Sequence, residues 1–163
     1  MTDNLVKIRD LWLEGRSDEQ WNPIINGVDL DLAKGEVLGL IGESGAGKST
    51  LGLAAMGYTR DGVRISKGSV EFDGIDLLQA SAAVKRNLLG KRIAYVAQSA
   101  AASFNPAHKI IDQQVEGPVQ HGLMKRGEAE MNGMELYQKL RLPDPDNIGF
   151  RFPHQVSGGQ LQR

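Results

Sequence analysis

The sequence contains no cysteine among its 163 residues. This absence excludes disulfide bonds and cysteine-ligated metal sites, and it fits a reducing compartment. The opening residues, MTDNLVK, lack the uninterrupted apolar stretch of a signal peptide. No apolar run approaches the roughly 20 residues that a membrane-spanning helix needs. We therefore expect a cytoplasmic protein that contacts a membrane only through a partner.

An excess of positive charge is also missing. Lysine and arginine number 19 against 20 aspartate and glutamate residues, giving a net charge of −1. A chain without a broad basic field does not hold a nucleic-acid backbone by charge, so nucleic acid is not expected as a partner. The length suits one globular domain. Glycine is abundant, with 20 residues against a usual share of roughly 7%.

The first part of the chain has the patterns of β-strands. Residues Leu5–Trp12 and Val28–Leu32 alternate apolar and polar side chains, which predicts strands with one wet face, joined by a polar loop over Glu14–Asn22. Asp73-Gly74 lies between two short alternating runs and predicts a hairpin turn. Val37–Ile41 does not alternate, which predicts a strand covered on both faces in a parallel sheet.

Helical patterns dominate after Gln98. Arg92–Val96 predicts one more buried strand before this residue. Ile111, Val115 and Val119 recur every four residues, and Pro118 is expected to end or bend their helix. A second stripe, predicted to be core packing, is formed by Met131, Met134, Tyr137 and Leu140.

The stretch GESGAGKST follows the predicted buried strand and opens a helix over Lys48–Met56. It matches the phosphate-binding loop, in which bare backbone N–H groups and a helix N-terminus surround phosphate oxygens. Side chains at Gly45 or Gly47 would block that approach. Lys48 is predicted to reach the β- and γ-phosphates as the catalytic lysine, and Ser49 to ligate Mg²⁺. The alternative is an ordinary glycine-rich turn between strand and helix; the phosphate-binding loop is favoured because the full pattern and its position agree, and not only the spacing. The predicted nucleotide-binding residues are Gly42, Glu43, Ser44, Gly45, Ala46, Gly47, Lys48, Ser49 and Thr50, although Thr50 could instead cap the helix.

A second glycine motif, VSGGQ, lies at Val156–Gln160. Ser157 at a helix N-cap, followed by Gly158 and Gly159, predicts another group of bare N–H donors. Together with the phosphate-binding loop, the motif resembles the signature of the ATP-binding subunit of an ATP-binding cassette (ABC) transporter, with Val156 in place of the usual leucine. The resemblance implies that Ser157, Gly158, Gly159 and Gln160 bind ATP held by the phosphate loop of a second ATP-binding subunit.

The resemblance extends to two further residues. Gln98 matches the glutamine that is expected to ligate Mg²⁺ or its water, and that senses the transmembrane permease subunits. Trp21 lies 27 residues before Lys48, where the family carries an aromatic residue that stacks on adenine. Base stacking of this kind contributes about 1–3 kcal/mol. Trp12 is the competing candidate, and Trp21 half-buried against the sheet is the structural alternative.

The segment after Gln98 resembles one subgroup of the family. Phe104-Asn105-Pro106, and Phe152-Pro153-His154 before the signature, are similar to the ATPases of peptide (oligopeptide, dipeptide or nickel) importers. Ser99-Ala100 and Gln160-Leu161 depart from that subgroup's usual residues. The resemblance implies ATP-driven peptide import, with the subunit held at the cytoplasmic side of the inner membrane by its permease partners. The three histidines are not predicted to be catalytic; His154 is interpreted as structural.

The fold class that follows is α/β: a P-loop NTPase core over about residues 1–98, with parallel core strands and antiparallel edge strands, and a helical subdomain over about 99–163. No run of four apolar residues followed by Asp-Glu occurs, so the family's general base is not found, and we expect an N-terminal fragment that binds ATP without hydrolysing it. Two other functions stay open, a soluble ABC ATPase of DNA repair or translation and a non-catalytic nucleotide-binding module. A P-loop kinase would not account for the SGGQ sequence.

Overall fold

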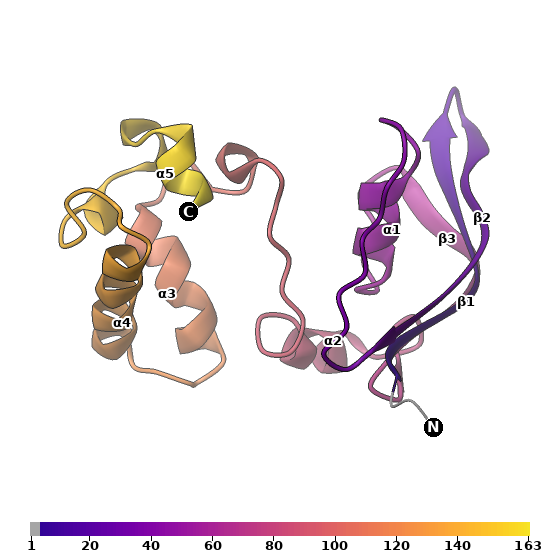
Figure 1. Cartoon of the computed structure of the whole chain (residues 1–163), viewed down its shortest axis with the longest axis horizontal. Helices are drawn as coiled ribbons and strands as arrows, with labels where there is room; N and C mark the ends of the chain where they lie inside the picture. The colour runs from indigo at the N-terminus through magenta and orange to yellow at the C-terminus, as the bar shows by residue number, and fades with distance from the viewer. Residues whose placement is uncertain (1–3) are drawn as a thin grey trace. The chain divides into compact units, whose positions relative to one another are not determined.

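The computed structural model describes residues 4–163, which form two compact units that divide between Arg86 and Asn87. The first unit contains the β-sheet and the helix that follows the phosphate-loop sequence, and the second is helical (Figure 1). Within residues 4–163, none of the helices has the length and apolar character that spanning a membrane requires.

The sheet of the first unit has four antiparallel strands in the order β2-β1-β3-β4. Their bounds are Asn4–Ser17 for β1, Gln20–Ala33 for β2, Val63–Phe72 for β3 and Ile75–Asp76 for β4. Strand β1 lies between two neighbours, and its Ile8, Leu11 and Leu13 are completely buried. The expected strands at Leu5–Trp12 and Val28–Leu32 are confirmed as parts of β1 and β2.

A bulge in β1 explains why Ile8 and Leu11, three positions apart, are both buried. The pairing with β2 and β3 shifts register after Ile8 and Arg9, and Asp10 takes a positive φ of 45°. The extra residue moves the inward-facing side chains from even positions, such as Ile8, to odd positions, such as Leu11. A prediction from alternating apolar and polar residues could not locate this bulge.

Both hairpin turns of the sheet use two residues with positive φ. Asp73 and Gly74 have φ values of 47° and 80°, which confirms the predicted turn. The predicted polar loop over Glu14–Asn22 is wrong: β1 and β2 pair as far as Ser17 and Gln20, so the turn consists of Asp18 and Glu19. Pairing with β1 places Trp21 in β2, because backbone hydrogen bonding outweighs the polar composition there.

The predicted parallel core strands are not found in the described residues. Val37–Ile41 does not form a strand, and Val37 and Ile41 are 95% and 96% exposed. Arg92–Val96 forms a single isolated bridge, between Leu89 and Ile93, and Val96 is 82% exposed. A strand requires a hydrogen-bonded neighbour as well as apolar side chains, and the described sheet offers none to these segments. The combination of helices with a sheet agrees with the predicted α/β class, and the antiparallel strands agree with the predicted edge strands.

Helix α1 (Lys48–Ala54) belongs to the first unit, and α2 (Ala82–Leu88) contains the division between the two units. Helix α1 buries Leu51, Leu53 and Ala54. It begins at the lysine of the phosphate-loop sequence, as expected.

The second unit packs α3 (Ile110–Gln120), α4 (Arg126–Lys139) and α5 (Gly158–Gln162) with short 3-10 helices at Ala100–Ala102, Ile148–Phe150 and Pro153–Gln155. Helix α3 ends at Gln120, beyond Pro118. The predicted core stripe is confirmed only in part: Tyr137 is buried and Met134 half-buried, whereas Met131 and Leu140 are 62% and 43% exposed. Helix α4 also buries Ala129 and Gly133, small residues at i and i+4 that allow α3 to approach closely. The core residues are Ile110, Ile111, Val115, Ala129, Tyr137, Leu142 and Ile148.

Candidate functional site

Hydrogen bonds from the Lys48 side chain stabilise the loop from Gly42 to Lys48. Lys48 Nζ donates hydrogen bonds to the carbonyl oxygens of Gly42, at 2.8 Å, and Glu43, at 2.6 Å. The Ala46 N–H closes a turn inside the loop by donating to the Glu43 carbonyl at 3.2 Å. The chain therefore forms a ring between Gly42 and the first residue of α1, with a cationic group beside it.

Two glycines of this loop are needed for different physical reasons. Gly45 has a φ of 86°, and nothing lies within 4 Å of where a Cβ would stand. Gly47 has a φ of 79°, and a Cβ there would lie 2.8 Å from Ile25 Cδ1 and 3.2 Å from Ile24 Cγ2. Gly47 thus lets the start of α1 pack directly against β2. Phosphate access was the reason expected from the sequence, and this packing adds a second one.

The N-terminus of α1 suits an anion. Gly47 is the N-cap and supplies no side-chain oxygen, and the first turn has no acidic residue. The first N–H groups of a helix lack intrahelical partners, and they carry the positive end of the helix dipole. Ser49 is exposed at this end, and Thr50 is half-buried. A phosphate group placed here would find donors and positive potential together.

Trp21, the predicted adenine-stacking residue, stands at the beginning of β2 and is 37% exposed. The guanidinium of Arg64 lies over its ring, 4.2 Å from the centroid, and pairs with Glu14 at 2.7 Å. Trp12, the competing candidate, donates from Nε1 to Asp10 Oδ1 at 2.7 Å. Lys67 also binds Asp10, at 2.7 Å, and these hydrogen bonds, with that of Lys67 first, lower the pKa of the Asp10 carboxyl.

The second glycine motif forms a reciprocally capped helix start. Gln160 N–H donates to Ser157 Oγ at 3.3 Å, and Ser157 N–H donates to Gln160 Oε1 at 2.9 Å. The S-x-x-Q spacing is the sequence signal for this capping box. The box gives Gln160 a structural role in addition to the ATP-binding role that the resemblance implies. Gly158 and Gly159 are exposed, and a Cβ at either position would meet nothing within 4 Å. Their backbone is open to an approaching group.

Gln98 is exposed, in a segment held by a residue that sequence reasoning missed. Gln162 on α5 donates from Nε2 to the Ala97 carbonyl at 3.0 Å and accepts from the Ala100 N–H at 3.0 Å. These partners lie 65 and 62 residues away in sequence, so no local pattern indicates them.

A second glutamine holds the Phe104-Asn105-Pro106 sequence. Gln113 on α3 accepts from Asn105 N–H at 2.8 Å and donates to the carbonyls of Asn105 and His108, both at 3.0 Å. Asn105 Oδ1 accepts from Ala107 N–H at 3.0 Å, a local turn that its side chain stabilises. Phe104 packs against the core of the helical unit.

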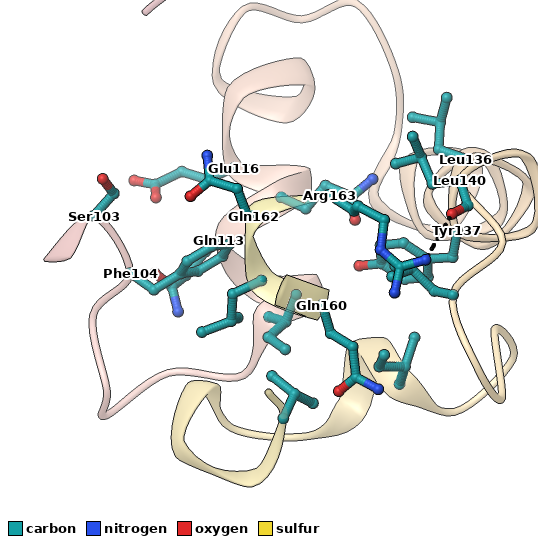
Figure 2. Close-up of a pocket in the computed structure, with 16 residues that line it drawn as sticks. Ser103, Phe104, Gln113, Glu116, Leu136, Tyr137, Leu140, Gln160, Gln162 and Arg163 are labelled. Carbon is teal, nitrogen blue, oxygen red and sulfur yellow. Dashed lines mark hydrogen bonds between the residues drawn. The ribbon is translucent and has the colours of Figure 1, made fainter. Parts of the chain in front are cut away.

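A pocket of about 540 Å³ lies among the helices of the second unit. Phe104, Leu136, Tyr137 and Leu140 line it together with residues of α5 (Figure 2). Burial raises the pKa of the Tyr137 phenol to about 12, and its hydroxyl makes no hydrogen bond. Arg163 Nη1 donates to the Arg141 carbonyl at 3.2 Å, next to the end of α4.

The structure distributes the predicted residues over both units. Trp21 and Gly42–Thr50 belong to the first unit, and Gln98 and Ser157–Gln160 belong to the second. His154 stacks on Phe152 with 5.7 Å between ring centroids, which agrees with a structural role.

A protein-family model described as ABC transporter matches residues 25–163. The chain is 33% identical to a probable peptide ABC transporter ATP-binding protein of Sinorhizobium fredii, an alignment that covers 99% of this chain and 48% of the relative. It is 37% identical to a dipeptide transport ATP-binding protein of Haemophilus influenzae, covering 85% and 42%. A metal-staphylopine import ATP-binding protein of Staphylococcus aureus is 33% identical, covering 100% and 57%. The chain thus spans about half the length of these curated relatives.

Solved structures share the fold. The dimeric structure of a bacterial ABC transporter cassette matches with a TM-score of 0.79 and 20% identity, covering 96% of this chain and 65% of that chain. A dimeric cassette in a post-hydrolysis state, bound to ADP and Pi, matches with a TM-score of 0.76 and 21% identity over the same shares.

Proposed function

The chain belongs to the ABC transporter family, and on that premise we propose that Gly42–Thr50 binds the triphosphate of ATP. The observation that carries the proposal is the ring between Gly42 and Lys48, which opens onto a helix start without a side-chain cap. In this arrangement Lys48 moves from two carbonyl oxygens to phosphate oxygens, whose full negative charge binds an ammonium more strongly. Trp21 is proposed to stack on adenine.

The proposed metal is Mg²⁺, with Ser49 and Gln98 as its protein ligands. The Ser49 hydroxyl and the Gln98 amide each offer an oxygen atom, the type of ligand that Mg²⁺ prefers, and both side chains are exposed. Bound Mg²⁺ would neutralise phosphate charge during phosphoryl transfer. Each of these residues would supply one oxygen ligand, and phosphate oxygens and water would complete the coordination of Mg²⁺.

The second ATP contact is proposed to come from a partner subunit. Ser157, Gly158 and Gly159 are exposed, and the capping box engages the N–H groups of Ser157 and Gln160 but not those of Gly158 and Gly159. Their open backbone supports docking against the triphosphate held by another copy or a paralogue. Closure of such a pair would depend on the γ-phosphate, because charge neutralisation from both sides is strongest when it is present.

We place the chain in the peptide-import branch of the family as part of this proposal. Support comes from the names of the relatives and from the Phe104-Asn105-Pro106 turn, which Gln113 fixes to α3. In the proposed transporter the subunit sits at the cytoplasmic face of the membrane through permease subunits, and ATP hydrolysis drives uptake. The 163 residues alone are proposed to bind ATP without turnover, since they contain no apolar strand that ends in Asp-Glu.

Binding of a fluorescent ATP analogue with Mg²⁺ tests the proposal. Replacing Lys48 by alanine removes a charge-assisted hydrogen bond worth about 1.5–3 kcal/mol, so we expect roughly 10- to 150-fold weaker binding. Lys139→Ala removes the same charge from an exposed position at the end of α4, and it should leave affinity unchanged. Equal affinities for the wild type and Lys48→Ala would contradict the proposal. A full-length subunit that never co-purifies with membrane subunits would favour a soluble ABC ATPase.

A further inference from the structure

The segment that carries Gln98 is fixed to α5 by one side chain. The amide of Gln162 pairs with the backbone on both sides of Gln98, donating to Ala97 and accepting from Ala100, each at 3.0 Å. The Gln162 side chain ends in a planar amide with an N–H donor and a carbonyl acceptor, so it pairs with a backbone segment as the backbone of a neighbouring strand would. No other uncharged side chain of this length carries both an amide donor and a carbonyl acceptor.

The same segment is anchored again further along. The 3-10 helix at Ala100–Ala102 follows the Gln162 contact, and Phe104 then packs on the helical core. Gln113 pairs with the backbone of Asn105. Figure 2 shows Gln113 and Gln162 near the segment that carries Ser103 and Phe104. Gln98 therefore belongs to a stretch that moves with the helical unit.

These hydrogen bonds are exposed, so their effect on overall stability is small. Their effect on position is larger, because two bonds to one rigid amide fix both the separation and the direction of the enclosed residues. Gln98 and Ser99 are the residues enclosed. Since Ser157 caps the helix that bears Gln162, one short element carries both the partner-facing motif and the anchor of Gln98.

We propose that Gln162 is a positioning residue for Gln98, the proposed Mg²⁺ ligand. Through Gln162, a change in the position of α5, whose N-cap is Ser157, also changes the position of Gln98. This inference rests on the proposed function for the role of Gln98. When α5 shifts as Ser157 and Gly158 engage ATP, the two hydrogen bonds shift Ala97 and Ala100 with it. Gln98 in one site thereby responds to occupancy of the other site.

Amide hydrogen exchange in the 163-residue chain tests the contact itself. In Gln162→Leu, the Ala100 amide should exchange roughly 2- to 12-fold faster, as loss of one exposed hydrogen bond implies. Gln162→Glu keeps the acceptor oxygen, so the Ala100 amide should stay protected. Gln113→Leu is the matched control and should accelerate exchange at Asn105 but not at Ala100. Equal exchange at Ala100 in the wild type and Gln162→Leu would overturn the inference.

Steady-state ATP hydrolysis by a full-length subunit containing this chain, assembled with its permease partners, tests the consequence. Gln162→Leu should lower kcat about 10-fold or more with KM within twofold, since an outer partner of a metal-binding residue acts on the chemical step. Gln162→Glu should recover part of the loss, and Gln138→Leu, at an exposed position of α4 outside this segment, should resemble the wild type. An unchanged kcat in Gln162→Leu would refute the positioning role alone. A wild-type assembly without hydrolysis would refute the proposed function and this role with it.

Discussion

Replacing Gly47 by alanine should destabilise the sheet-containing unit through two separable costs. The backbone at Gly47 has a φ of 79°, which costs an alanine about 1–2 kcal/mol. The new Cβ would lie 2.8 Å from Ile25 Cδ1 and 3.2 Å from Ile24 Cγ2. Overpacking of this kind costs about 1–3 kcal/mol. The free energy of unfolding should therefore fall by about 2–5 kcal/mol.

Two other glycines separate these costs. Gly45 has a φ of 86° and open space around it, so Gly45→Ala should lose only the backbone contribution of about 1–2 kcal/mol. Gly52 lies inside α1 without a positive φ and with nothing within 4 Å. Gly52→Ala should stabilise the unit by about 0.5–1 kcal/mol.

Urea unfolding followed by tryptophan fluorescence measures this series. Trp12 and Trp21, the two tryptophans of the chain, both lie in the unit that contains Gly47. The signal therefore reports that unit, and without nucleotide it separates packing from phosphate binding. If Gly47→Ala loses no more stability than Gly45→Ala, the contact with Ile25 does not constrain the loop.

Two further predictions concern Tyr137 and ATP turnover. Burial raises the pKa of Tyr137 to about 12 in the folded protein, whereas the unfolded phenol titrates near 10. The contribution of the buried, protonated phenol to the free energy of unfolding is therefore fully present below pH 10 and is lost as pH rises toward 12. Tyr137→Phe should reduce this alkaline loss when unfolding is followed by circular dichroism, whereas an unaltered pH profile would assign the loss to other groups. The 163-residue chain should release phosphate from MgATP no faster than its Lys48→Ala variant in a coupled assay; magnesium-dependent release that Lys48→Ala abolishes would show turnover.

Local chemistry predicted the parts of the fold that depend on neighbouring residues. Asp73-Gly74 fixes its hairpin through residues that tolerate positive φ, and α1 begins where the glycine loop ends. The strand predicted at Val37–Ile41 is wrong, because a strand depends on a partner elsewhere in the sheet and apolar composition does not supply one. The bulge at Asp10 likewise depends on pairing with both β2 and β3.

The candidate site divides in the same way. The Gly42–Lys48 loop and the Ser157 cap are contiguous motifs whose spacing reflects their geometry, so the sequence indicates them directly. The packing of Gly47 on Ile25 and the hydrogen bonds of Gln162 join residues far apart in the chain. Such contacts are visible only after folding brings the segments together.

Backbone amide chemical shifts recorded during ATP titration test the central claim most directly. We expect the amides of Gly45, Gly47 and Lys48 to shift in proportion to saturation with MgATP, and we expect Lys48→Ala to weaken that response at equal ATP concentration. Shifts that fall elsewhere while these three amides stay unchanged would contradict ATP binding by the Gly42–Thr50 loop.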